Sequence, residues 1–505
     1  MPGFLHSAFS NPRLRLLTGA GLALLVGQLP ALAALPPAAR STACVAAFTA
    51  WCWLTAALPL PVASLLPALL LPATGALPAD VVAPFYFQDI LLLFLGGFIL
   101  ALALERYQLH RRFALRALKL FGTRPRRVVL GFMAVAAVLS MFISNTSTAL
   151  LMLPVAVAVL EACRPEDSRR LGPPLLLGIA YACSIGGTAT PIGTAPNSVL
   201  LGQLSERFPE APQIAFGTWF IGAVPFALSF LLVSWLVLTR VVSRLPHAAV
   251  PELDELKRRG RELGRRTAAQ TRVLGVFLTV ALLWMTRQGA DFGVFAIPGW
   301  QLLLPPTVSA SISDSSVALL GVMLLFALPG EGERKSLLEW RDCAAIPWGV
   351  LLLLGGGFAL ARSFDATGLS AAIGESLSGT VGALPPVPTV VIVVLGVTFL
   401  TEITSNTATI NLLLPLIFSA CVAAEVNPML LAVPATFAVS CAFMLPVATP
   451  PNAILFGSGR ITVAQMARAG FLLNLLTAVF VTLFSLLWIA PRWGLDLSAF
   501  PEWAR

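Results

Sequence analysis

Two Ser-Asn-Thr triplets interrupt strongly apolar stretches of the chain. One is at residues 144–146, in FISNTSTALLMLP, and the other is at residues 405–407, in EITSNTATINLLLP. A polar tip between two helical arms leaves the first backbone N–H groups of the second arm without partners, and these groups carry partial positive charge. The hydroxyl and amide side chains add donors, so each tip is predicted to bind an anionic group. Two such tips facing each other suit a ligand with an anionic group at each end.

Two proline-broken runs supply a second kind of polar group. The long apolar runs 173–202 and 428–457 are interrupted at PIGTAPN (191–197) and PVATPPN (446–452). Proline removes a donor and clashes with the preceding turn, so backbone carbonyls near it lose their partners. Hard cations prefer oxygen ligands, and the breaks therefore predict sodium sites. The oxygen donors expected there are the side chains of Ser140, Asn145, Thr401 and Asn406 and carbonyls near Gly193 and Ala448.

Neither the tips nor the breaks contain Lys or Arg. Burying a dianion at the centre of a bilayer without a counter-charge is costly. Backbone dipoles alone are too weak to offset that cost, whereas bound cations can offset it. We therefore expect the two kinds of site to be coupled, with the anion sites competent only once the cation sites are filled.

The motifs are arranged as an internal repeat. Three pairs of residues are each separated by 261 positions, namely Ser140 and Thr401, Asn145 and Asn406, and Pro154 and Pro415. Upstream, WLT (53–55) and LFLGGF (93–98) are echoed by WMT (284–286) and LLGGGF (353–358). A basic segment, 105–127, follows the first GGF, whereas the segment after the second, 363–388, has no Lys or Arg. Because basic loops stay in the cytoplasm, the halves are predicted to be inverted, which is typical of secondary transporters.

The arms beside each tip are short. Runs 128–143 and 147–162 each hold about 16 residues and would span about 24 Å as helices, less than the ~30 Å hydrocarbon core. The runs 388–403 and 408–424 have the same form. We therefore predict two re-entrant helical hairpins, at 126–162 and 386–425, whose tips meet inside the membrane.

The composition limits the class of protein. Of 505 residues, 57% are hydrophobic and 11% are charged, whereas about 25% of the residues in a soluble domain are charged. The apolar runs are continuous rather than alternating, which predicts an all-α polytopic membrane protein. Much of the basic charge lies in segments 105–127 and 240–272, as expected of cytoplasmic loops. The net charge of +9 therefore does not predict a nucleic-acid partner.

The N-terminal run 14–36 has two interpretations, a first spanning helix with a cytoplasmic N-terminus or a signal peptide. We favour the helix and expect the protein to lie in a bacterial inner (plasma) membrane. The seven cysteines form no CxxC pair and the three histidines are far apart. The sequence therefore predicts no organic cofactor, no catalytic metal site and no enzyme activity.

Five segments resemble the divalent anion/sodium symporter family, which carries di- and tricarboxylates or sulfate with sodium. They are ISNTSTALLMLP, SIGGTATPIGTAPN, IPWGVLLLLGGGFALA, FLTEITSNTATINLLLPL and FMLPVATPPNAILFGSGR. The resemblance extends from about residue 50 to 490. It implies an inverted-repeat fold with about eleven transmembrane helices and two opposed re-entrant hairpins. It also implies a scaffold domain that forms a homodimer and a transport domain that moves as an elevator.

The same resemblance assigns roles to individual residues. One sodium site would use Ser140, Ser144, Asn145 and Gly193, and the other Thr401, Ser405, Asn406 and Ala448. The substrate carboxylates would contact Asn145, Thr146, Thr194, Asn406, Thr407, Thr449 and Pro450. Ala56 and Ala195 depart from the family's pattern, which commonly has an acid and a second proline there. Glu402 has Met141 as its counterpart in the first half, and we expect it to pair structurally or face a polar crevice rather than to act as a proton or cation partner.

These features divide the chain into four parts. They are an N-terminal segment with the first transmembrane helix (1–42), a first repeat (43–245) with hairpin 126–162 and broken helix 173–202, a basic cytoplasmic linker (246–268), and a second repeat (269–505) with hairpin 386–425, broken helix 428–457 and last helix 467–491.

The leading hypothesis is a sodium-coupled importer of a C4-dicarboxylate such as succinate, malate or fumarate. A sodium-independent dicarboxylate exchanger and a sulfate or citrate carrier are alternatives within the family. From other classes, an anion channel or the membrane subunit of an anion pump remains open. A membrane enzyme would need Cys, His or paired acids together at membrane depth, and the sequence shows no such constellation.

Overall fold

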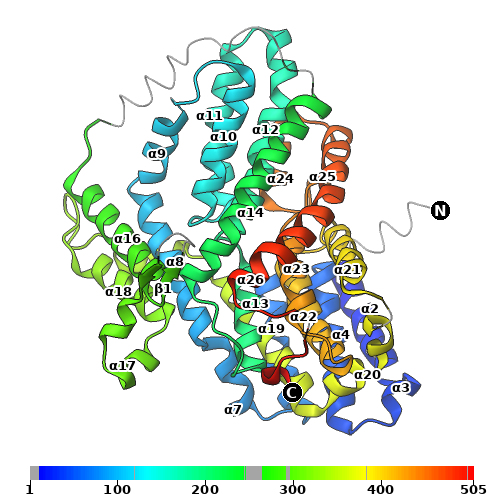
Figure 1. The fold of residues 1–505 in the computed structure, drawn as a ribbon. Helices are drawn as coiled ribbons and strands as arrows, with labels where there is room; N and C mark the ends of the chain where they lie inside the picture. The colour runs from blue at the N-terminus through cyan, green and yellow to red at the C-terminus, as the bar shows by residue number, and fades with distance from the viewer. Residues whose placement is uncertain are drawn as a thin grey trace.

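Helices form almost the whole of the computed structural model, which describes residues 11–118, 120–243, 245, 264–291, 296–382, 384–497 and 499–505 (Figure 1). The predicted linker at 246–268 lies outside these residues except for its last five. Many of the helices begin at a proline, whose fixed φ suits the first turn and whose missing N–H would have no partner there. Pro12, Pro37, Pro125, Pro165, Pro386 and Pro450 each open a helix in this way.

The first half of the chain contains the helices that precede residue 243. They are α2 (Pro12–Gly27), α3 (Pro30–Ala33), α4 (Pro37–Thr55), α5 (Leu60–Ala63), α6 (Leu66–Ala73), α7 (Ala79–Val82), η1 (Ala83–Phe87), α8 (Asp89–Arg106), α9 (Leu109–Leu118), α10 (Pro125–Ser140), α11 (Asn145–Ala162), α12 (Pro165–Gly187), α13 (Ala195–Arg207), α14 (Phe216–Leu236) and η2 (Val237–Val242).

The second half follows residue 264. Its helices are α16 (Ala268–Thr286), η3 (Trp300–Leu303), α17 (Pro306–Ser311), α18 (Asp314–Ala327), η4 (Trp340–Ala345), α19 (Trp348–Thr367), α20 (Leu369–Gly382), α21 (Pro386–Leu400), α22 (Asn406–Ala423), α23 (Met429–Val439), α24 (Pro450–Phe456), α25 (Val463–Phe484), η5 (Ser485–Ile489), α26 (Ala490–Arg492) and η6 (Glu502–Ala504). The all-α prediction misses one small antiparallel pair of strands, β1 (Gly289–Asp291) and β2 (Ala296–Pro298). Three paired residues per strand gave no alternating pattern long enough to read in the sequence.

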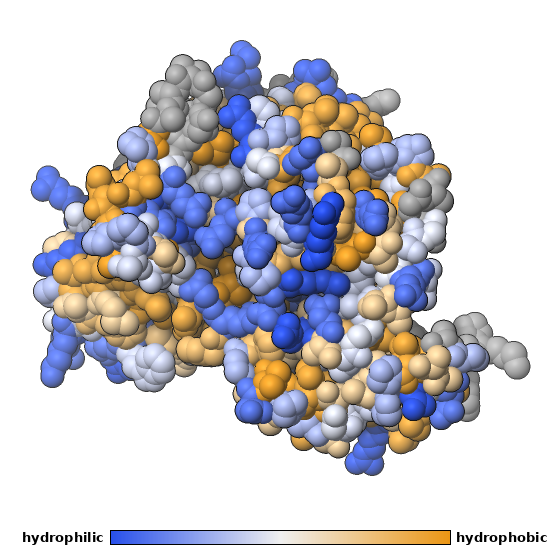
Figure 2. Space-filling model, turned by 60° about the horizontal axis from the view of Figure 1, so that its bottom comes forward, coloured by the Kyte–Doolittle hydropathy of each residue, from blue (hydrophilic) through white to orange (hydrophobic). Residues whose placement is uncertain are grey.

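The surface is that of a protein immersed in lipid. Within the described residues, seven helices are long and apolar enough to cross a membrane, and four shorter apolar helices accompany them. On α25 and η5 the side chains of Val479, Leu483 and Leu487, spaced four apart, are all at least half exposed, which forms an apolar stripe. Figure 2 shows one end of the molecule, where hydrophilic residues gather near the centre and apolar residues lie on the flanks. About eleven spans remain a prediction.

Two helix–turn–helix units hold the Ser-Asn-Thr triplets. They are α10 with α11, in the upper part of Figure 1, and α21 with α22, which lie lower and to the right. The second arms, α11 and α22, are 18 residues each, which is long and apolar enough to cross a membrane. Arm length therefore does not by itself support re-entrant hairpins, and that prediction now depends on where the tips lie.

The first hairpin is fastened to the broken helix that follows it. α10 and α12 share the most extensive contact between any two described helices. Gly186, in the last turn of α12, permits this contact, because a Cβ built there would lie 2.3 Å from the carbonyl oxygen of Ala137 and 2.5 Å from its Cα. Small residues allow this close approach of helix backbones in membrane proteins.

Gly186→Ala is therefore expected to force α12 away from α10 and to lower the melting temperature of the detergent-solubilised protein, since overpacking typically costs about 1–3 kcal/mol. Gly275→Ala on α16 is the matched control, because a Cβ there has nothing within 4 Å. Equal melting temperatures for the two variants would contradict this account of the packing.

Candidate functional site

The first tip is the turn 141–144 between α10 and α11. The Oγ of Ser144 accepts a hydrogen bond of 3.1 Å from the backbone N–H of Ser147 and so caps α11. Ser140, the last residue of α10, is fully buried, and its hydroxyl donates to the Oδ1 of Asn145. The tip is thus held together by short, neutral side chains.

The second tip, 401–405, repeats this arrangement with small differences. The hydroxyl of Thr401 is fully buried and lies 2.6 Å from Asn406 Oδ1 and 3.1 Å from the carbonyl oxygen of Val439. Ser405 precedes α22, but its side chain makes no capping hydrogen bond within the described residues. The N–H groups of the first turn of α22 are therefore more open than those of α11.

Each of the two breaks is bridged in the same way, by an asparagine whose side-chain amide hydrogen-bonds to backbone carbonyls across the gap in the helix. Asn197 Nδ2 donates to the carbonyl oxygens of Gly187 (3.0 Å) and Thr190 (2.7 Å). Asn452 Nδ2 donates in the same way to Ala442 and Leu445, at 3.1 Å each. Both asparagines are fully buried. They satisfy carbonyls that the broken helices leave free, which keeps each break in one conformation.

Glycine is required where the first tip meets the first break. A Cβ at Gly187 would lie 3.0 Å from Asn145 Oδ1 and 3.1 Å from the carbonyl oxygen of Gly193. A Cβ at Gly193 would lie 2.5 Å from the carbonyl oxygen of Gly187. The side-chain oxygen of Asn145 and the carbonyl of Gly193, both predicted sodium ligands, therefore lie at one place.

A single cavity of about 740 Å³ joins both tips and both breaks. The predicted site residues that line it are Ser144, Asn145, Thr146, Gly193, Thr194, Ser405, Asn406, Thr407, Ala448, Thr449 and Pro450. The two other predicted ligands, Ser140 and Thr401, do not line the cavity but hydrogen-bond to Asn145 and Asn406 from behind. Glu105 is the one charged residue among the lining residues.

The sequence interpretation missed the opposite wall of this cavity. Trp53 of α4, Phe94 and Phe98 of α8 and Val350 of α19 also line it. Three of them, Trp53, Phe94 and Phe98, belong to the repeated WLT and LFLGGF segments, so a signal was present, but it indicated duplication and not contact. Asn197 and Asn452 were likewise visible as the last residue of each proline motif, without an indication that they brace the breaks.

Glu402 pairs structurally, as expected. Its side chain is 3% exposed and accepts hydrogen bonds of 2.7–3.0 Å from the backbone N–H groups of residues 443–445 and from Asn474. It does not line the cavity.

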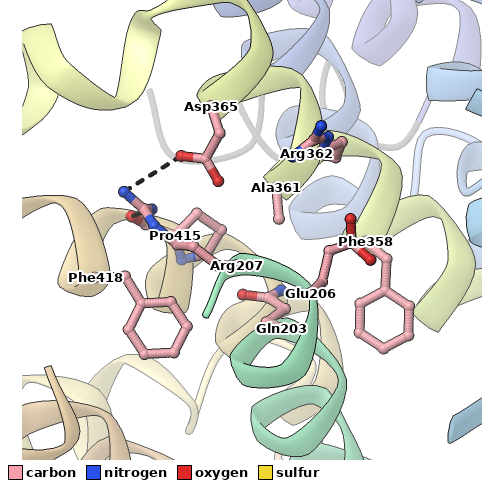
Figure 3. A pocket seen from close by; sticks show the side chains of 9 residues that line it. All are labelled: Gln203, Glu206, Arg207, Phe358, Ala361, Arg362, Asp365, Pro415 and Phe418. Carbon is pink, nitrogen blue, oxygen red and sulfur yellow. Dashed lines mark hydrogen bonds and ion pairs between the residues drawn. The ribbon is translucent and has the colours of Figure 1, made fainter. Parts of the chain in front are cut away.

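A second pocket lies between α13, α19 and α22 and contains basic side chains, but it is too small to hold a dicarboxylate (Figure 3). Its volume of about 10 Å³ is roughly that of one water. Arg207 forms an ion pair of 3.2 Å with Asp365 there and donates to Ser419 Oγ at 3.0 Å. The Arg207 guanidinium therefore links α13, α19 and α22. It does so at the C-terminal end of α13, whereas the helix break lies at the N-terminal end of α13.

No group of three or more His, Cys, Asp or Glu side chains suited to a metal ion occurs in the described ranges. A cation in the cavity would therefore be coordinated by hydroxyl, amide and backbone carbonyl oxygens. Such neutral oxygen ligands suit a monovalent hard cation, because fewer negative charges are needed to balance it.

Known proteins resemble this chain over most of its length. The sequence model described as "Sodium:sulfate symporter transmembrane region" matches residues 13–493. The "Sodium-dependent dicarboxylate transporter SdcS" of Staphylococcus saprophyticus is 38% identical over 468 residues, which is 90% of this chain and 87% of that protein. The transporter of the same name from Staphylococcus aureus is 38% identical over 453 residues, 87% of this chain and 84% of that protein.

Among solved structures, the YdaH transporter of Alcanivorax borkumensis matches with a TM-score of 0.55 over 81% of this chain and 87% of that one. The sequence identity is 13%, so this likeness concerns the fold alone. The family match confirms the family predicted from the motifs and, with it, transport rather than catalysis. The chain belongs to the sodium:sulfate symporter family of membrane transporters.

Proposed function

We propose that this protein imports a C4-dicarboxylate together with sodium ions by an elevator movement. The observation that carries the proposal is the cavity in which both Ser-Asn-Thr tips and both helix breaks meet without a Lys or Arg among the lining residues. A dianion in this cavity would find amide dipoles and hydroxyl donors but no fixed positive charge. Sodium ions bound beside it would supply that charge, so each ligand would favour binding of the other.

The paired tips favour a ligand with two anionic ends. Thr146 and Asn145 stand at the start of one helix, Asn406 and Thr407 at the start of the other, and all four line the cavity. Each helix start would receive one carboxylate. A sulfate ion has a single charged centre and would leave one start unoccupied. The sodium-dependent dicarboxylate transporters that this chain resembles support the same choice.

An elevator movement agrees with the way the cavity is divided. Its polar lining comes from the hairpins and the broken helices, whereas its apolar wall comes from α4, α8 and α19. If the hairpins and broken helices slide along α4, α8 and α19, all the polar residues proposed to bind substrate and sodium would move together as one body. The cavity reaches Glu105, the first residue of the basic segment that we place in the cytoplasm, which fits a site facing the inside of the cell.

The remaining assignments follow the family resemblance. We propose a homodimer held by the scaffold helices, in the plasma membrane of a bacterium and with a cytoplasmic N-terminus.

The proposal predicts that proteoliposomes containing the protein take up labelled succinate only when sodium is present outside. A sodium gradient should drive accumulation, and malate should compete better than sulfate, citrate or aspartate. The measurement is initial uptake with sodium or choline outside. Sodium-independent counterflow between internal and external succinate would instead identify an exchanger and overturn symport.

Asn145→Ala and Asn406→Ala should each reduce succinate uptake at low substrate about tenfold to a hundredfold, since a hydrogen bond to a charged group contributes about 1.5–3 kcal/mol. Asn11→Ala is the matched control, because the Asn11 side chain caps α2 by accepting a hydrogen bond from Arg13 N–H and does not line the cavity. Uptake and its sodium dependence should be unchanged in this control. Normal uptake by either cavity variant would refute the assignment of the site.

A further inference from the structure

The two helix breaks differ in where the helix stops. In the first half, helical bonding continues to Ala189, whose N–H bonds the carbonyl of Gly186. In the second half it stops at Cys441, three residues earlier when the breaks are aligned on Asn197 and Asn452. The backbone N–H groups of residues 443–445 are consequently outside the helix and need other partners.

The carboxylate of Glu402 is that partner. Its Oε1 lies 2.7 Å from the N–H nitrogen of Phe443 and 2.9 Å from that of Met444, and its Oε2 lies 3.0 Å from the nitrogens of Met444 and Leu445. Asn474 of α25 donates a further hydrogen bond of 2.7 Å. Three backbone amides and one side-chain amide thus converge on a single buried carboxyl group.

Among the described residues of the first half, no carboxyl group makes such an interaction with the break. Met141 occupies the position of Glu402, and the tip is joined to the break by the hydroxyl of Thr190, which donates to the carbonyl of Met141. A hydroxyl and a backbone carbonyl therefore make the junction in one half, and a carboxyl group with backbone amides makes it in the other. The earlier end of α23 and the acid at residue 402 occur together in the second half, as they would if the acid replaces the lost helical bonds.

This junction connects the two parts of the second predicted cation site. On one side, Glu402 directly follows Thr401, whose hydroxyl holds Asn406. On the other side, Leu445 is also bound by Asn452, whose N–H bonds Thr449 Oγ1 at 3.3 Å. Ala448 lies within this braced segment.

The geometry points to Glu402 as a positioning residue that fixes the second cation site by tying the break at 443–445 to the hairpin tip. It touches neither cation nor substrate, since it lies behind the cavity wall. The N–H and C=O of a trans peptide group point in opposite directions. Peptide groups whose N–H faces Glu402 therefore turn their carbonyl oxygens away from Glu402. The inference rests on the proposed function only in taking the cation to be sodium.

The test measures sodium binding without transport. The melting temperature of the purified full-length protein in detergent is recorded over a series of sodium chloride concentrations, with choline chloride keeping the ionic strength constant. Glu402→Gln keeps the size of the side chain but turns an amide NH₂ toward N–H donors. The sodium concentration for half-maximal stabilisation should rise about tenfold or more, and Glu402→Asp should recover part of the loss.

Glu375→Gln is the control, because it makes the same chemical change on the exposed face of α20 and should leave the sodium dependence unchanged. If Glu402→Gln does not fold, Asn474→Leu, which removes one of the donors, decides the question with an expected rise of about threefold. A wild-type sodium dependence in the deciding variant, or a loss of stability that is equal with and without sodium, would overturn the inference. Wild-type protein that binds sodium but does not take up succinate would overturn only the proposed function.

Discussion

The central constraint on this molecule is that a carrier of anions has no basic side chain among the described residues that line the cavity joining its two tips. Backbone amides are the strongest neutral donors available, and they become available only where a helix begins or is interrupted. The chain therefore starts two helices, α11 and α22, and breaks two others at a single cavity. The hairpins and broken helices follow from this requirement, and no Lys or Arg stands among the described residues that line the cavity.

Exposing backbone groups in this way would destabilise the protein if they could move freely, so each break is braced. Asn197 and Asn452 cross the gaps, the buried hydroxyls of Ser140 and Thr401 hold the tips, and Glu402 binds the unwound amides of the second half. Glycines at 186, 187 and 193 let the backbones approach closely enough for these bonds to form. The close packing of the helices and the hydrogen bonding of the exposed backbone groups therefore depend on each other.

The polar part of the cavity lining was largely predictable from the sequence, because its residues cluster in short motifs that occur twice. The Ser-Asn-Thr triplets marked both helix starts, and the prolines marked both breaks. The wall formed by Trp53, Phe94 and Phe98 was not predictable, because apolar residues far apart in the chain carry no signal of mutual contact. The lengths of the second arms were underestimated because the Asn and Thr of each tip already belong to the first turn of the arm. The unequal unwinding of the two breaks depends on one buried carboxylate, which the pattern of apolar residues cannot reveal.

The polar side chains that the two Ser-Asn-Thr triplets present to the cavity are all short, and this choice affects how quickly a ligand can come and go. Such side chains have one or two rotatable bonds, whereas a lysine or arginine clamp would lose roughly 2 kcal/mol of rotamer entropy when it closes on a ligand. Hydrogen bonds within each tip already fix the rotamers of these side chains. Few rotamers are therefore left to order when a ligand binds or to free when it leaves, which favours rapid exchange in a protein that must complete both steps in every cycle.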